Sequence, residues 1–186
     1  MRALVFVLLG LGVLRELDAL AYAWLAHPPN QLSIWASHFG DNLAYLVAGL
    51  YALWLLRRGQ RGELSFFLLL LAGQHLWVNL SKALFHSLRP LQAAQVGGFA
   101  YPSGHTAMAT CVYGTLARRQ HRAWAVLILV VAWARMALGH HWLSDVLGGG
   151  LLGWMWLDAC PWQVGANLGV SNLPAQGAGV DQESAA

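Results

Sequence analysis

Three short stretches of this 186-residue chain contain the residue types that phosphate chemistry uses. The first runs from Lys82 to Pro90, the second from Tyr101 to His105, and the third from Arg135 to Asp145. Together they supply cations, histidines, one carboxylate and a turn that contains glycine. Positive side chains and free N–H groups at a helix N-terminus both stabilise a phosphoryl group and the charge that grows in its transition state. We therefore predict that the three stretches form one phosphate-binding site.

The third stretch also contains a candidate nucleophile. His141 and Asp145 are four residues apart, so they share a face if this segment is helical. A carboxylate there can fix the imidazole tautomer and leave the other ring nitrogen free to attack. His105 is a candidate general acid for the leaving oxygen. The backbone N–H groups of Ser103 and Gly104 are candidate phosphate donors, because glycine lets the backbone approach a ligand closely.

The composition indicates that a membrane surrounds these stretches. Hydrophobic residues make up 58% of the chain and charged residues 10%, whereas a soluble domain has about 25% charged residues. The net charge of +3 comes without a basic stripe and interleaved aromatic residues, which argues against nucleic-acid binding. Six apolar segments approach the roughly 20 residues that span a bilayer: 3–25, 40–56, 64–82, 104–118, 123–140 and 142–160. We predict an all-α bundle of six transmembrane helices with the active site at the extracytoplasmic helix ends.

We expect one membrane domain over residues 1–162 and a disordered tail over 163–186, since the tail has too little apolar surface to pack. The first segment has a second interpretation, because Arg2, the apolar run from Ala3 to Leu14 and the sequence Ala19-Leu20-Ala21 resemble a signal peptide. Charged residues between that run and the cleavage site favour an uncleaved helix. Two of them, Arg15 and Asp18, are spaced to pair within such a helix.

Arginine placement predicts the orientation of the bundle. Cytoplasmic loops carry an excess of Lys and Arg, and seven basic residues fall on one side of the six-span arrangement: Arg2, Arg57, Arg58, Arg61, Arg118, Arg119 and Arg122. That side is therefore expected to be cytoplasmic, with both termini. The opposite side, which faces the periplasm or exterior, carries Lys82, Arg89 and Arg135.

The three stretches resemble the motifs of the type 2 phosphatidic acid phosphatase (PAP2) superfamily, K-x6-RP, PSGH and SR-x5-H-x3-D. The first two match in full, and the third has Ala134 where the family usually has Ser. The motifs cover residues 82–145, and the six-segment layout extends the resemblance to about 160 residues. Small bacterial membrane lipid phosphatases, such as undecaprenyl diphosphate phosphatases, are the most similar in kind.

The resemblance implies a role for each motif residue. His141 would form a phosphohistidine, Asp145 would orient it, and His105 would protonate the leaving group. The phosphoryl oxygens would bind to Lys82, Arg89, Arg135 and the amides of Ser103 and Gly104. The family needs no metal or other cofactor. His140 is excluded as the nucleophile, because only His141 lies six residues after Arg135 and four before Asp145.

Two other functions remain to be weighed. The first is a non-enzymatic scaffold or transport protein in which the charges mark an ion path. Such a path would place ionisable groups at mid-membrane, whereas these residues lie at helix ends. A soluble relative, such as an acid phosphatase or haloperoxidase, conflicts with the hydropathy. Among lipid substrates, the short chain favours undecaprenyl diphosphate, while phosphatidylglycerophosphate, phosphatidate and lipid A phosphates stay open. The sequence thus predicts a phosphatase of the bacterial inner membrane that acts on a lipid phosphate.

Overall fold

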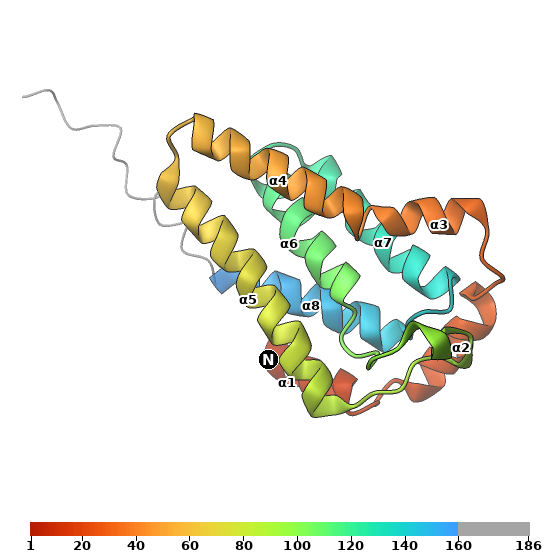
Figure 1. The fold of residues 1–186 in the computed structure, drawn as a ribbon. Helices are drawn as coiled ribbons and strands as arrows, with labels where there is room; N and C mark the ends of the chain where they lie inside the picture. Colours follow the sequence, from red (N-terminus) through yellow and green to blue (C-terminus); the bar gives the residue numbers. More distant parts are fainter. Residues whose placement is uncertain (160–186) are drawn as a thin grey trace, which may run out of the picture.

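A computed structural model describes residues 1–159 of the chain, and these form eight α-helices and two short 3-10 helices (Figure 1). The predicted tail over 163–186 lies outside the described residues. In chain order the elements are α1 (Arg2–Gly10), α2 (Arg15–Leu25), α3 (Gln31–His38), α4 (Asn42–Arg57), α5 (Arg61–Phe85), η1 (Leu91–Val96), α6 (Gly104–Arg119), η2 (Arg122–Trp124), α7 (Ala125–Ala137) and α8 (Leu143–Ala159). The prediction of an all-α chain is therefore confirmed for the described residues.

Helix α6 lies at the centre of the bundle, and every residue from Thr106 to Leu116 is buried. It contacts α4, α5, α7 and α8. Many of its residues are small or are threonines, and threonine hydroxyls can bond to the carbonyl one turn earlier. Thr110 and Thr115 do this at 2.8 and 2.6 Å, so their polar groups are satisfied inside the core.

Helix α8 packs closely against α6 because glycines face the contact. A Cβ atom added to Gly149 would collide with the backbone carbonyl of Ser103, and one added to Gly153 would lie 2.9 Å from the carbonyl oxygen of Ala107. Small residues four apart on a helix let two backbones approach, as in membrane helix pairs. This approach brings the start of α6 against the start of α8, where the second and third predicted stretches lie.

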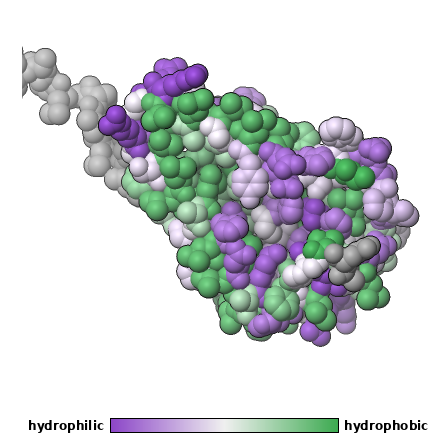
Figure 2. All heavy atoms as spheres, viewed as in Figure 1, coloured by the Kyte–Doolittle hydropathy of each residue, from purple (hydrophilic) through white to green (hydrophobic). Residues whose placement is uncertain are grey.

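The outward faces of α4 and α5 are apolar. Large hydrophobic side chains such as Leu50, Leu69 and Leu76 are more than half exposed. Figure 2 shows hydrophobic atoms over these two helices and hydrophilic atoms at the turn that joins them. Two segments of the described chain are long and apolar enough to cross a membrane, Gln31–Arg57, which combines α3 and α4, and Arg61–Phe85, which is α5.

The first predicted segment, 3–25, is not one helix. It is divided into α1 and α2 by a turn over residues 11–14, in which Gly12 adopts a φ of +79°. The proposed pairing of Arg15 with Asp18 is also wrong. The buried Asp18 carboxylate instead accepts hydrogen bonds from the backbone N–H and the hydroxyl of Ser144, at 2.7 and 2.8 Å. The break in the helix thus turns α2 toward the start of α8.

Helix α3 was not predicted from the sequence. It begins with a capping box in which Asn30 accepts a hydrogen bond from the backbone N–H of Ser33, and the Ser33 hydroxyl faces the Asn30 backbone. Such reciprocal bonds satisfy the free donors at a helix start. The helix packs on α7 and leads into Asp41, which precedes α4.

We predict that Gly149→Ala destabilises the protein, because the added methyl group meets backbone atoms of Ser103, which cannot rotate away. Overpacking of this kind costs about 1–3 kcal/mol. Thermal unfolding in detergent measures the loss. The matched control is Gly49→Ala on α4, where an added Cβ meets nothing within 4 Å and helix propensity favours alanine. An unfolding temperature for Gly149→Ala at or above that of Gly49→Ala would contradict the close packing of α6 and α8.

Candidate active site

The connection between α7 and α8 brings His141 into the centre of the site. Helix α7 ends in two hydrogen bonds, from the N–H of Gly139 to the carbonyl of Met136 and from the N–H of His140 to the carbonyl of Arg135. This is the Schellman pattern, which needs a residue in the left-handed region. Gly139 supplies it with a φ of +66°. The chain then reverses, and His141 is almost fully buried just before α8 begins.

The two ring nitrogens of His141 have different partners. Nδ1 lies 3.2 Å from Oδ2 of Asp145, and Nε2 lies 3.2 Å from Nη1 of Arg89. A guanidinium can only donate, so Nε2 must be the nitrogen with the lone pair and Nδ1 must carry the proton that Asp145 accepts. His141 therefore presents an unprotonated Nε2 toward the cations, which is the arrangement that a nucleophile requires.

The surroundings of His141 keep its ring neutral. Burial of the side chain, reinforced by the positive charges of Arg135 and Arg89, holds its pKa well below the usual value of 6.5. A lowered pKa means that the neutral form of the ring predominates at neutral pH. The nucleophile is thus available without an additional base to remove a proton.

Asp145 is held by the start of its own helix. It is the third residue of α8 and is fully buried, and its Oδ2 also accepts a hydrogen bond from the backbone N–H of Trp142 at 2.9 Å. Its neighbour Ser144 is bound by Asp18 of α2. Two carboxylates therefore occupy the N-terminus of α8, where negative charge is favoured, and both fix the position of that helix start.

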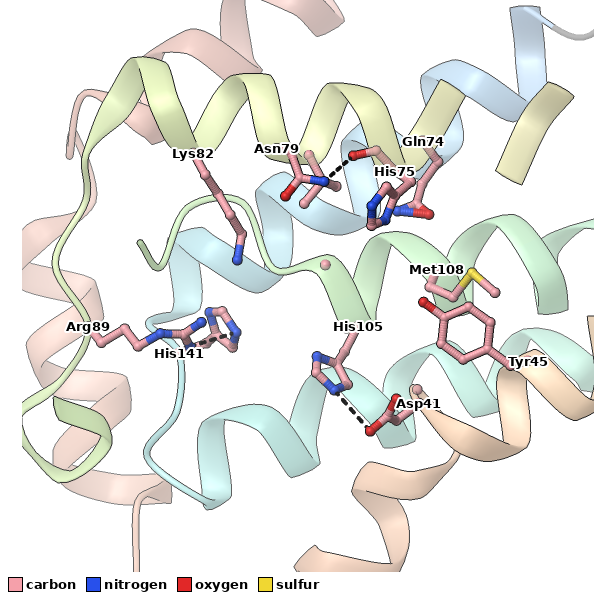
Figure 3. Close-up of a pocket in the computed structure, with 13 residues that line it drawn as sticks. Asp41, Tyr45, Gln74, His75, Asn79, Lys82, Arg89, His105, Met108 and His141 are labelled. Carbon is pink, nitrogen blue, oxygen red and sulfur yellow. Dashed lines mark hydrogen bonds and ion pairs between the residues drawn. The ribbon is translucent and has the colours of Figure 1, made fainter. Parts of the chain in front are cut away.

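Three cations act on His141: Lys82 and Arg89 line the same pocket, and Arg135 acts on the ring from α7. Lys82 lies near the end of α5 and points into the same pocket as Arg89 and His141 (Figure 3). Arg89 is oriented by the carbonyl oxygens of Gly97 and His140, at 3.0 and 2.9 Å. The pocket encloses about 220 Å³. Cationic groups held in fixed positions stabilise the charge of a phosphoryl transition state.

Arg135, the third cation, is almost entirely buried in α7. Its Nη1 donates to the hydroxyl of Ser37 in α3 at 2.8 Å. Its Nε has no hydrogen-bond partner among the described residues. A buried donor without a partner is costly. Arg135 itself is not a lining residue of the pocket that Lys82, Arg89 and His141 share.

The second stretch contributes differently from the sequence-based prediction. The backbone N–H of Ser103 was expected to face phosphate, but it donates to the carbonyl oxygen of Asp145 at 2.9 Å. That bond ties the start of α6 to the start of α8. Gly104 begins α6 and lines the pocket. Its N–H belongs to the first turn, where amides have no partner within the helix.

His105 lies across the pocket from His141, on the first turn of α6 (Figure 3). Its Nε2 lies 3.8 Å from Oδ2 of Asp41. His140, in contrast, is not a lining residue of this pocket, although it is adjacent to His141 in sequence. Within residues 1–159, no three His, Cys, Asp or Glu side chains are grouped as metal ligands.

Comparison with known proteins identifies the family. The model of the PAP2 superfamily matches residues 62–168, which is more than half of the chain and includes all three stretches. The chain belongs to the PAP2 superfamily. It is therefore a membrane phosphatase that acts on a lipid phosphate.

A solved structure has the same PAP2 fold. It is a transmembrane PAP2-type phosphatidylglycerolphosphate phosphatase from Bacillus subtilis, with a TM-score of 0.76 and 20% sequence identity. The match covers 93% of this chain and 97% of that chain. A search of curated proteins found no match. At this level of identity the structure supports the shared fold, and the substrate has to be argued separately.

Three polar residues of the site region in this PAP2 chain were not predicted from the sequence. Asp41, Ser37 and Asp18 contact His105, Arg135 and Ser144 respectively. All three lie outside the motifs, 64 to 126 residues away from their partners. Asp18 was noticed only as a charge within an apolar segment. No spacing rule connects residues this distant, so the structure was needed to find them.

We predict that His141→Ala abolishes turnover of a lipid phosphate, whereas His140→Ala retains most of it. The reason is that, of these two residues, His141 is the one whose ring bonds to Asp145 and contacts Arg89. Removal of a nucleophile costs several orders of magnitude in kcat, and removal of Asp145 as its orienting partner should cost less. Steady-state phosphate release by purified variants of equal thermal stability is the measurement. Loss of turnover in His140→Ala with retention in His141→Ala would refute the assignment.

Proposed function

We propose that this PAP2 phosphatase hydrolyses the terminal phosphate of a membrane lipid through a phosphohistidine at His141. The observation that carries the proposal is the tautomer of the His141 ring. Its Nδ1 hydrogen-bonds to Asp145, and its Nε2 faces Arg89. In the first step Nε2 attacks phosphorus, the bond to the leaving oxygen breaks, and His105 gives that oxygen a proton. In the second step water attacks the phosphohistidine, His105 takes a proton from the water, and inorganic phosphate leaves.

Four groups bind the phosphoryl oxygens in this proposal. They are Lys82, Arg89, Arg135 and the N–H of Gly104. Ser103 acts indirectly, since its own N–H bonds to Asp145 and so holds the turn that presents Gly104. As Asp145 stabilises the positive charge that forms on His141 during attack, its role is the usual one of the carboxylate partner of a histidine.

The physiological lipid is a separate part of the proposal. Undecaprenyl diphosphate, which the short chain favours, stays our first prediction. Phosphatidylglycerophosphate is the comparison substrate, because the Bacillus subtilis structure is titled a phosphatidylglycerolphosphate phosphatase. Phosphate release from both lipids, and from phosphatidate and lipid A, by the purified protein in detergent ranks them by kcat/KM. A labelled phosphoenzyme that is stable in base, labile in acid and missing in His141→Ala would establish the intermediate.

We predict full activity in excess EDTA, since the positive charges that neutralise phosphate come from Lys82, Arg89 and Arg135. Arg89→Lys should still reduce kcat/KM by about tenfold or more, because lysine cannot reproduce the planar fork of a guanidinium. Phosphate release with and without chelator is the measurement, and vanadate, a mimic of five-coordinate phosphorus, should inhibit. Complete loss of turnover in EDTA, restored by magnesium, would disprove the metal-free mechanism.

We also predict that the active site faces the periplasm or exterior of a bacterial inner membrane, with the termini in the cytoplasm. The arginines of the α4–α5 turn and of the α6–α7 connection set this orientation. In a background without Cys111 and Cys160, a cysteine at Leu91, which is 93% exposed, should react with a membrane-impermeant maleimide in intact cells. A cysteine at Gln60, at the α4–α5 turn, should react only after lysis. The reverse pattern would invert the proposed topology.

A further inference from the structure

An acidic side chain in the connection between α3 and α4 faces His105, the proposed proton donor on α6. Asp41 joins α3 to α4, and its Oδ2 lies 3.8 Å from Nε2 of His105 (Figure 3). The side chain does not cap α4, although Asp41 occupies the residue before the helix. Its carboxylate is about half exposed and lines the pocket. Its position therefore calls for an explanation other than helix capping.

The backbone is shaped to bring Asp41 close to His105. The preceding residue, Gly40, lies so close to α6 and α7 that an added Cβ would be 3.2 Å from Cβ of His105 and 2.5 Å from a methyl group of Val131. Only glycine fits such an approach without displacing its neighbours. The α3–α4 connection is thus packed directly against the first turn of α6.

The charges of the pocket explain what the carboxylate does there. His105 shares the pocket with Lys82 and Arg89, and the positive charge of Arg135 also acts on its ring. A proton on His105 therefore adds a fourth positive charge to the site. Neighbouring cations disfavour a protonated imidazole, and a neighbouring carboxylate favours it. Among the described residues that line the pocket, Asp41 is the acidic one. It offsets the cations on the side where the leaving group must receive its proton.

We propose that Asp41 is a positioning residue that orients His105 and favours the protonated form of its ring, which donates to the leaving oxygen. The proposal rests on the phosphohistidine mechanism above. Asp41 accepts the N–H of one ring nitrogen, and the other nitrogen gives its proton to the oxygen as the bond to phosphorus breaks. The present distance of 3.8 Å is an ion-pair distance. Catalytic hydrogen bonds are often long without substrate and shorten when it binds.

The test compares two substrates that differ only in the leaving group. Phenyl phosphate has a poor leaving group that needs a proton, whereas 4-nitrophenyl phosphate has a good one that departs as an anion. Only kcat/KM is compared, since it reports the steps up to phosphoryl transfer and excludes hydrolysis of the phosphohistidine. In Asp41→Asn, kcat/KM for phenyl phosphate should fall by about tenfold or more, a fraction of what a general acid contributes. The fall for 4-nitrophenyl phosphate should be several times smaller.

Further variants test whether Asp41 acts through His105 or independently of it. His105→Ala should show the same selectivity with a larger loss, and adding Asp41→Asn to it should cause no further selective loss, because the two residues act as a unit. Asp41→Glu, which keeps the carboxylate, should recover part of the phenyl phosphate activity. Glu16→Gln, an exposed acid on α2, should leave both rates unchanged.

Each remaining outcome decides the question. Equal losses on the two substrates in Asp41→Asn would overturn the proposal and place Asp41 with the phosphate-binding group around Arg135. Unchanged rates on both would overturn it as well. If Asp41→Asn does not accumulate as folded protein, Asp41→Ser must show the same selective loss. Failure of the wild-type protein to release phosphate from any substrate would instead refute the proposed function.

Discussion

The close approach of α6 and α8 is the constraint on which the site depends. Asp145, the proposed carboxylate partner, lies at the start of α8, and His141, the proposed nucleophile, lies just before it. His105, the proposed proton donor, lies at the start of α6. Gly149 and Gly153 let the two backbones come together, and the bond from Ser103 N–H to the Asp145 carbonyl joins their first turns. Larger residues at either glycine would separate the two helix starts, and with them the two halves of the site.

A second constraint is electrostatic. Three cations beside a histidine would be unfavourable in a buried pocket unless other groups compensated their charge. The structure compensates with carbonyl oxygens around Arg89 and the Ser37 hydroxyl on Arg135. A phosphate would complete this balance. The burial that makes the cations effective is also what keeps the imidazole of His141 neutral.

Much of the site could be predicted from the sequence, because its residues form three compact motifs. The pairing of His141 with Asp145 was predicted from their spacing of four. In the structure His141 lies before the first residue of α8, so its ring reaches Asp145 from outside the helix and not along a shared helix face. The role of the Ser103 amide could not be predicted, since it depends on how α6 meets α8. The break at Gly12 was missed for a related reason. An apolar run indicates burial but does not show where the chain turns within it. Here the turn places Asp18 against Ser144, a contact that the sequence does not reveal.

Among the outer helices, too, those with long apolar runs could be predicted from the sequence, and the one that depends on packing could not. The apolar runs that form α4 and α5 are evident from composition, and their ends were predicted to within a few residues. Helix α3 has eight residues, fewer than the roughly 20 that predict a membrane span, and the sequence does not show that it packs on α7. Its two contributions, Ser37 and the connection through Gly40, both act on residues of other helices.

The contact between Arg89 and Nε2 of His141 has a consequence for the resting protein. The guanidinium occupies the lone pair that would otherwise face the pocket, so the ring is shielded from small electrophiles such as alkylating reagents. A phosphoryl dianion that bound this guanidinium would weaken its contact with Nε2 and so expose the nitrogen. His141 would then react only with a ligand that carries an anion able to bind Arg89. Selectivity for phosphate esters over other electrophiles would arise at this binding step, before any bond forms.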